Sequence, residues 1–270
     1  NEHDKKAFDA VLLTTYLSDN GSALSMDIIF RYFKVVDYRY AKEIINRAKS
    51  LLRDFILFEE DKIAQDYFKL RSKLFALYAI DILRYENTLK IKYAKIIERF
   101  IYEIPPYIIF RYDVFIRKSY DSNLFYNLFG NNGDHIYSYL YKYDSNSYTL
   151  QQWALFLAKL GNYKQAFIYI DKAMSEKPNN FSMKNSRAII LFEANRKQKT
   201  SLALEKMKEA MEILRACYTN DKRKVYHAQI FSEFAMVLND NYHDNKYLDE
   251  AQKWIREIME KEESNSRRTK

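Results

Sequence analysis

The chain is poor in the residues that turn and cross-link a polypeptide. Its 270 residues include only 4 glycines, 3 prolines and 1 cysteine. β-Sheet proteins need many tight turns, which glycine and proline supply, so this scarcity favours a mainly helical protein. A lone cysteine, Cys217, cannot form an intramolecular disulfide, which is typical of a reducing compartment. We expect it to be a small buried apolar residue.

Long apolar runs are also missing. The longest ones, such as residues 80–83, are far too short to span a bilayer. The N-terminal sequence Asn-Glu-His-Asp-Lys-Lys lacks the apolar core of a signal peptide. We therefore expect a cytoplasmic protein without a membrane partner. Because the chain has no initiator methionine and starts within a charged segment, we also expect it to be part of a longer protein.

Catalytic motifs are absent from the sequence. It contains no Gly-x-x-x-x-Gly-Lys-Ser/Thr phosphate loop, and its 4 histidines are scattered without an HExxH motif. A single cysteine gives a zinc site too few ligands. Carboxylate pairs such as Glu59-Glu60 and Glu262-Glu263 are typical of a turn and a solvated helix end. The sequence therefore predicts no enzyme activity, no cofactor and no metal site for this chain.

The residues that are abundant indicate a globular protein. Apolar residues make up 48% of the chain and charged residues 30%, a balance that excludes a disordered chain and a protein embedded in lipid. The net charge of +8 permits acidic partners without requiring them, because acidic residues are interspersed throughout. The 24 tyrosines and 18 phenylalanines fit an AT-rich coding sequence and a binding surface equally well.

Residues 1–70 have the pattern of a winged helix. Helical spacing of apolar residues predicts helices at 5–17 and 38–52, with a short helix capped by Ser25 between them. Two short apolar runs, 55–58 and 63–67, flank the charged residues 59–62 and predict a β-hairpin. The expected inward residues of the third helix are Ala41, Ile44, Ile45, Ala48 and Leu52.

Residues 71–147 return to helical spacing. Pro105-Pro106 ends one of these helices, since a prolyl ring blocks the helical conformation of the residue before it. Residues 130–134 form the clearest loop. We assign the segment to a helical linker or to diverged repeats. The apolar face of its first helix is predicted to contain Leu70, Leu74, Leu77, Tyr78 and Ile82.

Residues 153–178 carry the strongest pattern in the chain, a helix-turn-helix repeat. Closely packed antiparallel helices need small residues where they cross and glycine at a sharp turn, and both occur here. The spacing resembles the tetratricopeptide (TPR) repeat nearly position by position. The resemblance assigns Ala154, Ala166 and Ala173 to close helix contacts, Gly161 to the turn, Tyr163 to packing between helices, and Pro178 to the break before the next repeat.

A second unit follows with the same period. Ala188 follows Ala154 at the TPR period of about 34 residues. Ala203 and Ala210 then repeat the spacing that Ala166 and Ala173 have in the second helix of the first unit. The second unit departs from the TPR pattern by a short insertion around residues 196–200 and by Asn195 in place of the turn glycine.

A third, degenerate unit is expected at residues 230–259, with a long polar loop at 239–246. We therefore assign residues 148–260 to TPR-like repeats, and with them a mainly α fold, an antiparallel helix-pair solenoid preceded by the winged-helix segment. Residues 261–270 are polar and basic and predict a disordered tail.

The order of these segments is similar to the C-terminal half of STAND-type NTPases, including bacterial antiviral (Avs) members. In that family a winged helix follows the nucleotide-binding core and leads into a TPR-like sensor. Residues 67–75 look like the end of their winged helix, although Ser72 stands where that family often has histidine. The resemblance implies a sensor module that binds a protein ligand, such as a phage protein, within a parent protein that oligomerises on activation.

The first helix of each repeat lines the concave face of TPR stacks, so the resemblance implies ligand contacts there. Their mixed polar and apolar character suits a protein surface or peptide better than a small molecule. Leu155 and Ile189 fit equally well as core residues, and this alternative stays open. The implied protein-binding residues are Tyr148, Gln151, Leu155 and Lys159 in the first repeat, then Ser182, Asn185, Ile189 and Glu193 in the second.

Two other functions remain as alternatives. A winged helix can bind nucleic acid, and the third helix carries Arg39, Lys42, Arg47 and Lys49. The acidic turn at residues 59–61 opposes this function, because carboxylates repel phosphate. A stand-alone TPR scaffold or adaptor is the other alternative.

Overall fold

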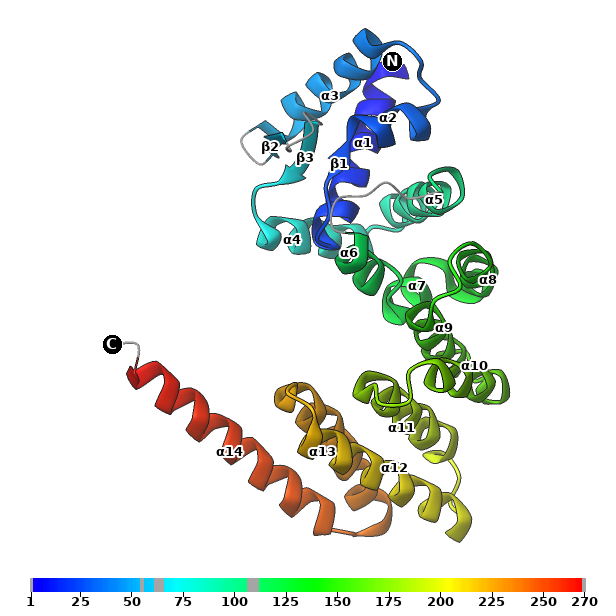
Figure 1. Cartoon of the computed structure of the whole chain (residues 1–270), viewed down its shortest axis with the longest axis vertical. Coiled ribbons are helices and arrows are strands. Elements are labelled where there is room, and N and C mark those ends of the chain that lie inside the picture. Colours follow the sequence, from blue (N-terminus) through cyan, green and yellow to red (C-terminus); the bar gives the residue numbers. More distant parts are fainter. Residues whose placement is uncertain (1, 54–55, 61–65, 106–111, 269–270) are drawn as a thin grey trace. The chain divides into compact units, whose positions relative to one another are not determined.

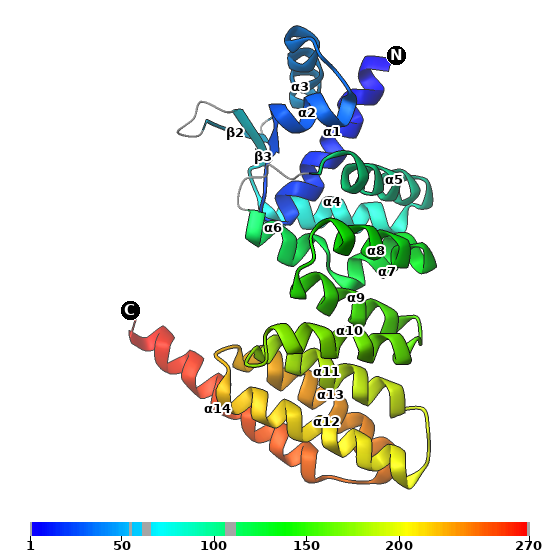
Figure 2. The ribbon, with the colours of Figure 1, turned by 45° about the vertical axis from the view of Figure 1, so that its right-hand side comes forward.

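The computed structural model of this chain describes residues 2–53, 56–60, 66–105 and 112–268. These residues are mainly helical with one small antiparallel sheet, as the scarcity of glycine and proline predicts. The chain divides into two compact units, Asn1–Ser145 and Asn146–Lys270, coloured blue to green and green to red in Figures 1 and 2. None of the described helices combines the length and the apolar character needed to cross a membrane.

The first unit opens with short helices and strands. They are α1 (Glu2–Asp19), β1 (Leu24–Ser25), α2 (Met26–Phe33), α3 (Tyr38–Leu52), β2 (Ile56–Glu60) and β3 (Asp66–Leu70). The strands form one antiparallel sheet in the order β1-β3-β2. Ser25 caps α2 as predicted, since its Oγ accepts a hydrogen bond from the Ile28 N–H at 3.3 Å. The predicted stripe of α3 is buried as expected.

The sheet differs from the prediction in register and in strand number. β3 begins at Asp66, later than expected, and residues 61–65, which include the end of the predicted turn and the start of the predicted second strand, lie outside the described residues. The later register buries Phe68 and Leu70. The sequence does not predict β1, because two residues are too few to show the alternation of a strand. β1 pairs Leu24 with Phe68.

The remaining elements of the first unit are helical. They are α4 (Lys73–Tyr85), α5 (Asn87–Glu103), α6 (Tyr112–Ser119), α7 (Ser122–Phe129), the 3₁₀ turn η2 (Gly130–Asn132) and α8 (Gly133–Tyr143). α1 packs against α3, α4, α5 and β3. Its Tyr16 ring lies edge-on to Phe100 and Phe115, with centroid distances of 5.8 Å in both cases. Residues on both sides of the expected division at residue 70 thus share one core.

The second unit consists of helix pairs. They are α9 (Ser147–Lys159) with α10 (Tyr163–Glu176), α11 (Phe181–Asn195) with α12 (Ser201–Asn220), and α13 (Lys224–Tyr242) with α14 (Lys246–Arg268). Each pair packs on the next through α10 against α11 and α12 against α13. The pairs lie side by side in both ribbon views (Figures 1 and 2).

The residues predicted to sit at close helix contacts are buried. Gly161 adopts a φ of +81°, which side-chain-bearing residues rarely adopt, so the turn between α9 and α10 requires glycine. Tyr163 is half-buried at the start of α10, and Pro178 lies between α10 and α11. The buried alanines are Ala154, Ala166, Ala173, Ala188, Ala203 and Ala210.

The third helix pair differs from the prediction at two helix ends. α13 continues to Tyr242, so the expected loop at 239–246 shortens to residues 243–245. α14 continues to Arg268, so residues 261–268 are helical where we expected a disordered tail. This segment contains neither glycine nor proline, and its lysine, glutamate and arginine residues favour helix. Trp254 of α14 stacks on Tyr218 of α12, with ring centroids 3.8 Å apart.

Candidate functional site

The eight predicted protein-binding residues differ in how exposed their side chains are. Gln151 and Asn185 are buried, so they cannot contact a ligand as the resemblance implied. Ile189 is partly buried and packs against the core of the second unit, which supports its alternative assignment as a core residue. Tyr148, Leu155, Ser182 and Glu193 are half-exposed, and Lys159 is exposed.

Gln151 connects the first helix pair to the second. Its Nε2 lies 3.1 Å from the carbonyl oxygen and 3.0 Å from Oγ of Ser182, and 2.8 Å from Oγ of Ser186. Because the amide nitrogen carries two hydrogens, it donates two of these bonds at a time. A buried amide with these partners holds α9 against α11 in a fixed register.

Asn185 repeats this arrangement in the next pair. It stands one repeat period after Gln151 and connects α11 to α13. Its Nδ2 lies 3.3 Å from the Tyr226 hydroxyl oxygen, and its Oδ1 lies 2.9 Å from Nδ1 of His227. The N-caps Asn146 and Asn180 recur at the same period, and each accepts hydrogen bonds from the backbone N–H groups two and three residues later.

His227 is a buried polar residue that the sequence patterns did not single out. Its Nε2 lies 2.8 Å from Oδ2 of Asp221. Burial lowers the pKa of His227, and the hydrogen bond to Asp221 opposes this shift without cancelling it. A neutral ring donates from Nε2 to Asp221. In that ring Nδ1 is an acceptor and needs a donor opposite it. Exchanging the nitrogen and oxygen of the Asn185 side-chain amide supplies this donor, and the amide oxygen then accepts from the Tyr226 hydroxyl.

Two groups near His227, the Asp221 carboxyl and the Cys217 thiol, have shifted pKa values. Burial alone would raise the pKa of Asp221. Hydrogen bonds from Arg223 and His227 outweigh this effect and hold the pKa well below its usual range. Burial raises the pKa of the Cys217 thiol to about 11, so the thiol is protonated at neutral pH. The prediction of a small buried cysteine is confirmed.

Part of the predicted nucleic-acid face of α3 is engaged within the protein. Arg47 donates to Asp4 at 2.7 Å and pairs with Glu43 at 3.1 Å. Lys49 Nζ lies 5.0 Å above the Phe68 ring. The other two predicted cations of α3 are exposed, and the acidic wing turn lies outside the described side chains. Arg47 is thus paired with carboxylates, and both Lys42 and Lys49 lie over aromatic rings.

A basic groove of about 490 Å³ lies between α1, α2 and α5. Two of its four cations have protein partners. Lys92 Nζ lies 2.9 Å from Asp9, and Arg99 donates to the Tyr32 carbonyl at 2.6 Å with its guanidinium 4.6 Å from the Tyr32 ring. Lys5 and Lys95 supply the remaining charge. The hydrogen bond to a carbonyl does not cancel the charge of Arg99, so a single carboxylate, Asp9, faces four cations and the groove remains basic.

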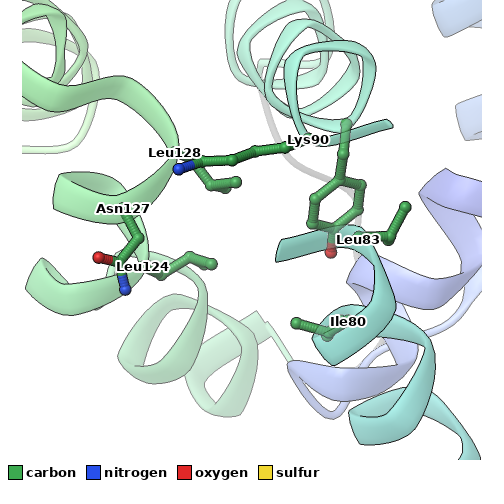
Figure 3. A pocket seen from close by; sticks show the side chains of 7 residues that line it. Ile80, Leu83, Lys90, Leu124, Asn127 and Leu128 are labelled. Atoms are coloured by element: carbon green, nitrogen blue, oxygen red, sulfur yellow. The ribbon is translucent and has the colours of Figure 1, made fainter. Parts of the chain in front are cut away.

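A small cavity lies between α4, α5 and α7 (Figure 3). Its volume of about 10 Å³ is close to the minimum for one water molecule. Ile80 and Leu83 project into it from α4 and Leu124 and Leu128 from α7 (Figure 3). The cavity is a packing gap in an apolar core and too small for a substrate.

Four of the five residues predicted for the apolar face of α4 are exposed, which corrects the prediction, and the fifth, Leu70, is buried at the end of β3. Ala76, Ile80 and Leu83, on the opposite side of the helix, are the buried residues. α4 carries large apolar residues on both sides, so its sequence does not indicate which side packs inward. Sequence reasoning therefore missed an exposed apolar surface formed by Leu74, Leu77, Tyr78, Ile82 and Tyr85.

Comparison with known proteins gives no match to a family model, to a curated protein or to a solved structure. Within the described ranges, no three histidine, cysteine, aspartate or glutamate side chains gather in a group that could hold a metal ion.

Proposed function

We propose that this chain is a protein-recognition module that binds its ligand across α9, α11 and α13 of the second unit. In this proposal the helix pairs are TPR-like repeats, and the open side of the first helix in each pair forms the ligand surface. The observation that carries the proposal is the recurrence of a buried amide, Gln151 and then Asn185, at the repeat period, each bonded to the first helix of the next pair.

This repetition matters because it fixes the relative register of three helices. A buried amide that loses its partners costs free energy, so each bridge favours one alignment of its two helices. By helical periodicity Tyr148 and Leu155 share a face of α9 with Gln151, and Ser182 and Ile189 share a face of α11 with Asn185. A surface held in register in this way is preorganised, which lowers the entropic cost of binding.

The chemistry of this surface supports a protein ligand. Tyrosine and aliphatic side chains with charged residues around them are typical of the centre and rim of protein interfaces. Tyr148 and the partly exposed Tyr226 supply the aromatic rings, Leu155 an aliphatic contact, and Lys159 and Glu193 charges of both signs. Lys177 Nζ lies 4.3 Å from the Tyr148 ring centroid, which restrains that ring.

We also propose that the chain is the sensor part of a larger STAND-type NTPase, with a phage protein among its candidate ligands. The order α1–β1–α2–α3–β2–β3 and the strand order β1-β3-β2 support a winged helix ahead of the repeats. Upstream sequence tests this part directly. A phosphate loop encoded before Asn1 would support it, and a start codon at that point would rule it out in favour of a small scaffold protein.

Affinity purification tests the recognition proposal. The tagged chain is incubated with extracts of phage-infected and uninfected bacteria, and the proteins retained are quantified by mass spectrometry. The double variant Leu155→Asp/Lys159→Glu changes the α9 surface. Losing a central interface contact costs at least about 1.4 kcal/mol, so we expect a loss of at least about tenfold in the retained ligand.

A matched variant on the other helix of the same pair serves as the control. Ile168→Asp/Lys164→Glu changes an exposed apolar residue and an exposed lysine on α10. We expect it to retain the ligand as the wild type does. Enrichment of no protein, or equal losses for the two variants, would contradict the proposed surface.

A further inference from the structure

The outer face of α4 is unusually apolar for an exposed surface. It is formed by Leu74, Leu77, Tyr78, Ile82 and Tyr85. The opposite side of α4 packs on α1, α5 and β3. The outer side chains are 45% (Leu77) to 89% (Tyr85) exposed. Figure 1 shows α4 at the edge of this unit.

Single exposed apolar residues are ordinary, but a continuous stripe is not. Pairs of the outer residues are three or four positions apart along the helix (74 and 77, 74 and 78, 78 and 82, 82 and 85), so they lie on one side of α4, which they share with Asp81. Large apolar residues on both sides of a helix are typical of a helix that is buried on both sides. The composition of α4 therefore fits a helix covered on both sides, while the described residues of the first unit cover one.

We propose that the outer face of α4 pairs with the same face of a second copy of this chain, forming a two-fold symmetric dimer. A large side chain buries about 150–250 Å² when fully covered, so five at these exposures offer roughly 500–700 Å². Pairing covers this area on both copies, roughly 1,000–1,400 Å² in total, which reaches the range of specific interfaces.

The sequence of the stripe is self-complementary in an antiparallel arrangement. A two-fold axis between residues 79 and 80 places the ends of the stripe, Leu74 and Tyr85, against each other across the interface. The same axis places Tyr78 opposite Asp81 of the second copy. The tyrosine hydroxyl can then donate to that carboxylate, which gives the interface a charge-assisted hydrogen bond on each side of the axis. A two-fold axis thus matches both the apolar and the polar residues of the stripe.

Sedimentation velocity of the full chain tests this proposal. At about 100 µM we expect twice the monomer mass of 32.5 kDa. Leu74→Glu/Tyr85→Glu introduces charges into the stripe and is expected to raise the dissociation constant at least a hundredfold. The matched control is Leu202→Glu/Val225→Glu, which changes two isolated exposed apolar residues of the second unit and should leave the dimer intact.

A conservative variant distinguishes lost pairing from lost folding. Tyr78→Phe keeps the shape of the ring and removes the hydroxyl, so we expect dimerisation about tenfold weaker with an unchanged circular dichroism spectrum. Three results would overturn the proposal: a monomeric wild type, a Leu74→Glu/Tyr85→Glu variant that still dimerises, or an open-ended assembly in place of a dimer. Binding of a different protein by a monomeric chain through this face would overturn it as well.

Discussion

Replacing Gln151 with leucine tests whether this amide holds two helix pairs together or faces a ligand. The change keeps the approximate volume of the side chain and removes its hydrogen-bond donors. Gln151 is 3% exposed and lies within 3.1 Å of oxygen atoms in Ser182 and Ser186. Gln151→Leu therefore leaves these partners without their donor in a buried position.

The expected loss follows from the two bonds that the amide can donate at once. A typical intramolecular hydrogen bond contributes about 0.5–1.5 kcal/mol net, so the loss in the free energy of unfolding is about 1–3 kcal/mol. For a unit of this size each kcal/mol lowers the melting temperature by roughly 3–6 °C. We therefore expect melting about 3–18 °C below the wild type.

Tryptophan fluorescence reports this change without interference from the first unit, because both tryptophans of the chain, Trp153 and Trp254, are buried in the second unit. Urea unfolding followed at this signal gives the free energy directly. Gln229→Leu is the control, since Gln229 is exposed on α13 and its loss should change stability by less than about 0.5 kcal/mol. Equal stabilities of Gln151→Leu and the control would refute the bridging role and restore Gln151 as a ligand contact.

Three further predictions concern the second unit. Phe192→Ala removes a buried ring stacked 3.8 Å from Phe234 and should cost about 3–5 kcal/mol by urea unfolding; a loss below about 1 kcal/mol would contradict this packing. Burial lowers the pKa of His227, so below pH 6.5 the unfolded chain takes up a proton at this residue more readily than the folded protein does. The contribution of His227 to stability is therefore complete above pH 6.5 and declines as the pH falls. His227→Gln should flatten the decline in melting temperature between pH 7.5 and 5. Arg215→Met breaks the two contacts of 2.7 and 2.6 Å with Glu250 and should cost up to about 1 kcal/mol at low ionic strength, with a smaller difference in 1 M salt.

The sequence predicts helices well where one face differs clearly from the other. α3 has its predicted bounds and its predicted buried residues, because its apolar positions occupy one side only. The cap at Ser25 and the turn at Gly161 are predictable as well, since each position requires a particular residue type. Local chemistry determines these features, so local sequence reveals them.

Features that depend on distant partners are not predictable in this way. The exposed face of α4 looks like a core face until the positions of α1 and α5 are known. Gln151 and Asn185 look like ligand contacts until Ser186 and His227 are found beside them, 35 and 42 residues away along the chain. β1 exists only because β3 pairs with it. Tertiary contacts decide each of these cases.

Site-specific photo-cross-linking tests the proposed recognition surface most directly. A benzophenone-bearing amino acid is placed at residue 155 on α9, and at residue 168 on α10 as the control. After exposure to extracts of phage-infected bacteria, we predict that a defined protein is cross-linked at position 155 and not at position 168. Absence of a cross-linked protein at position 155, or the same products at both positions, would contradict recognition through the first helices of the pairs.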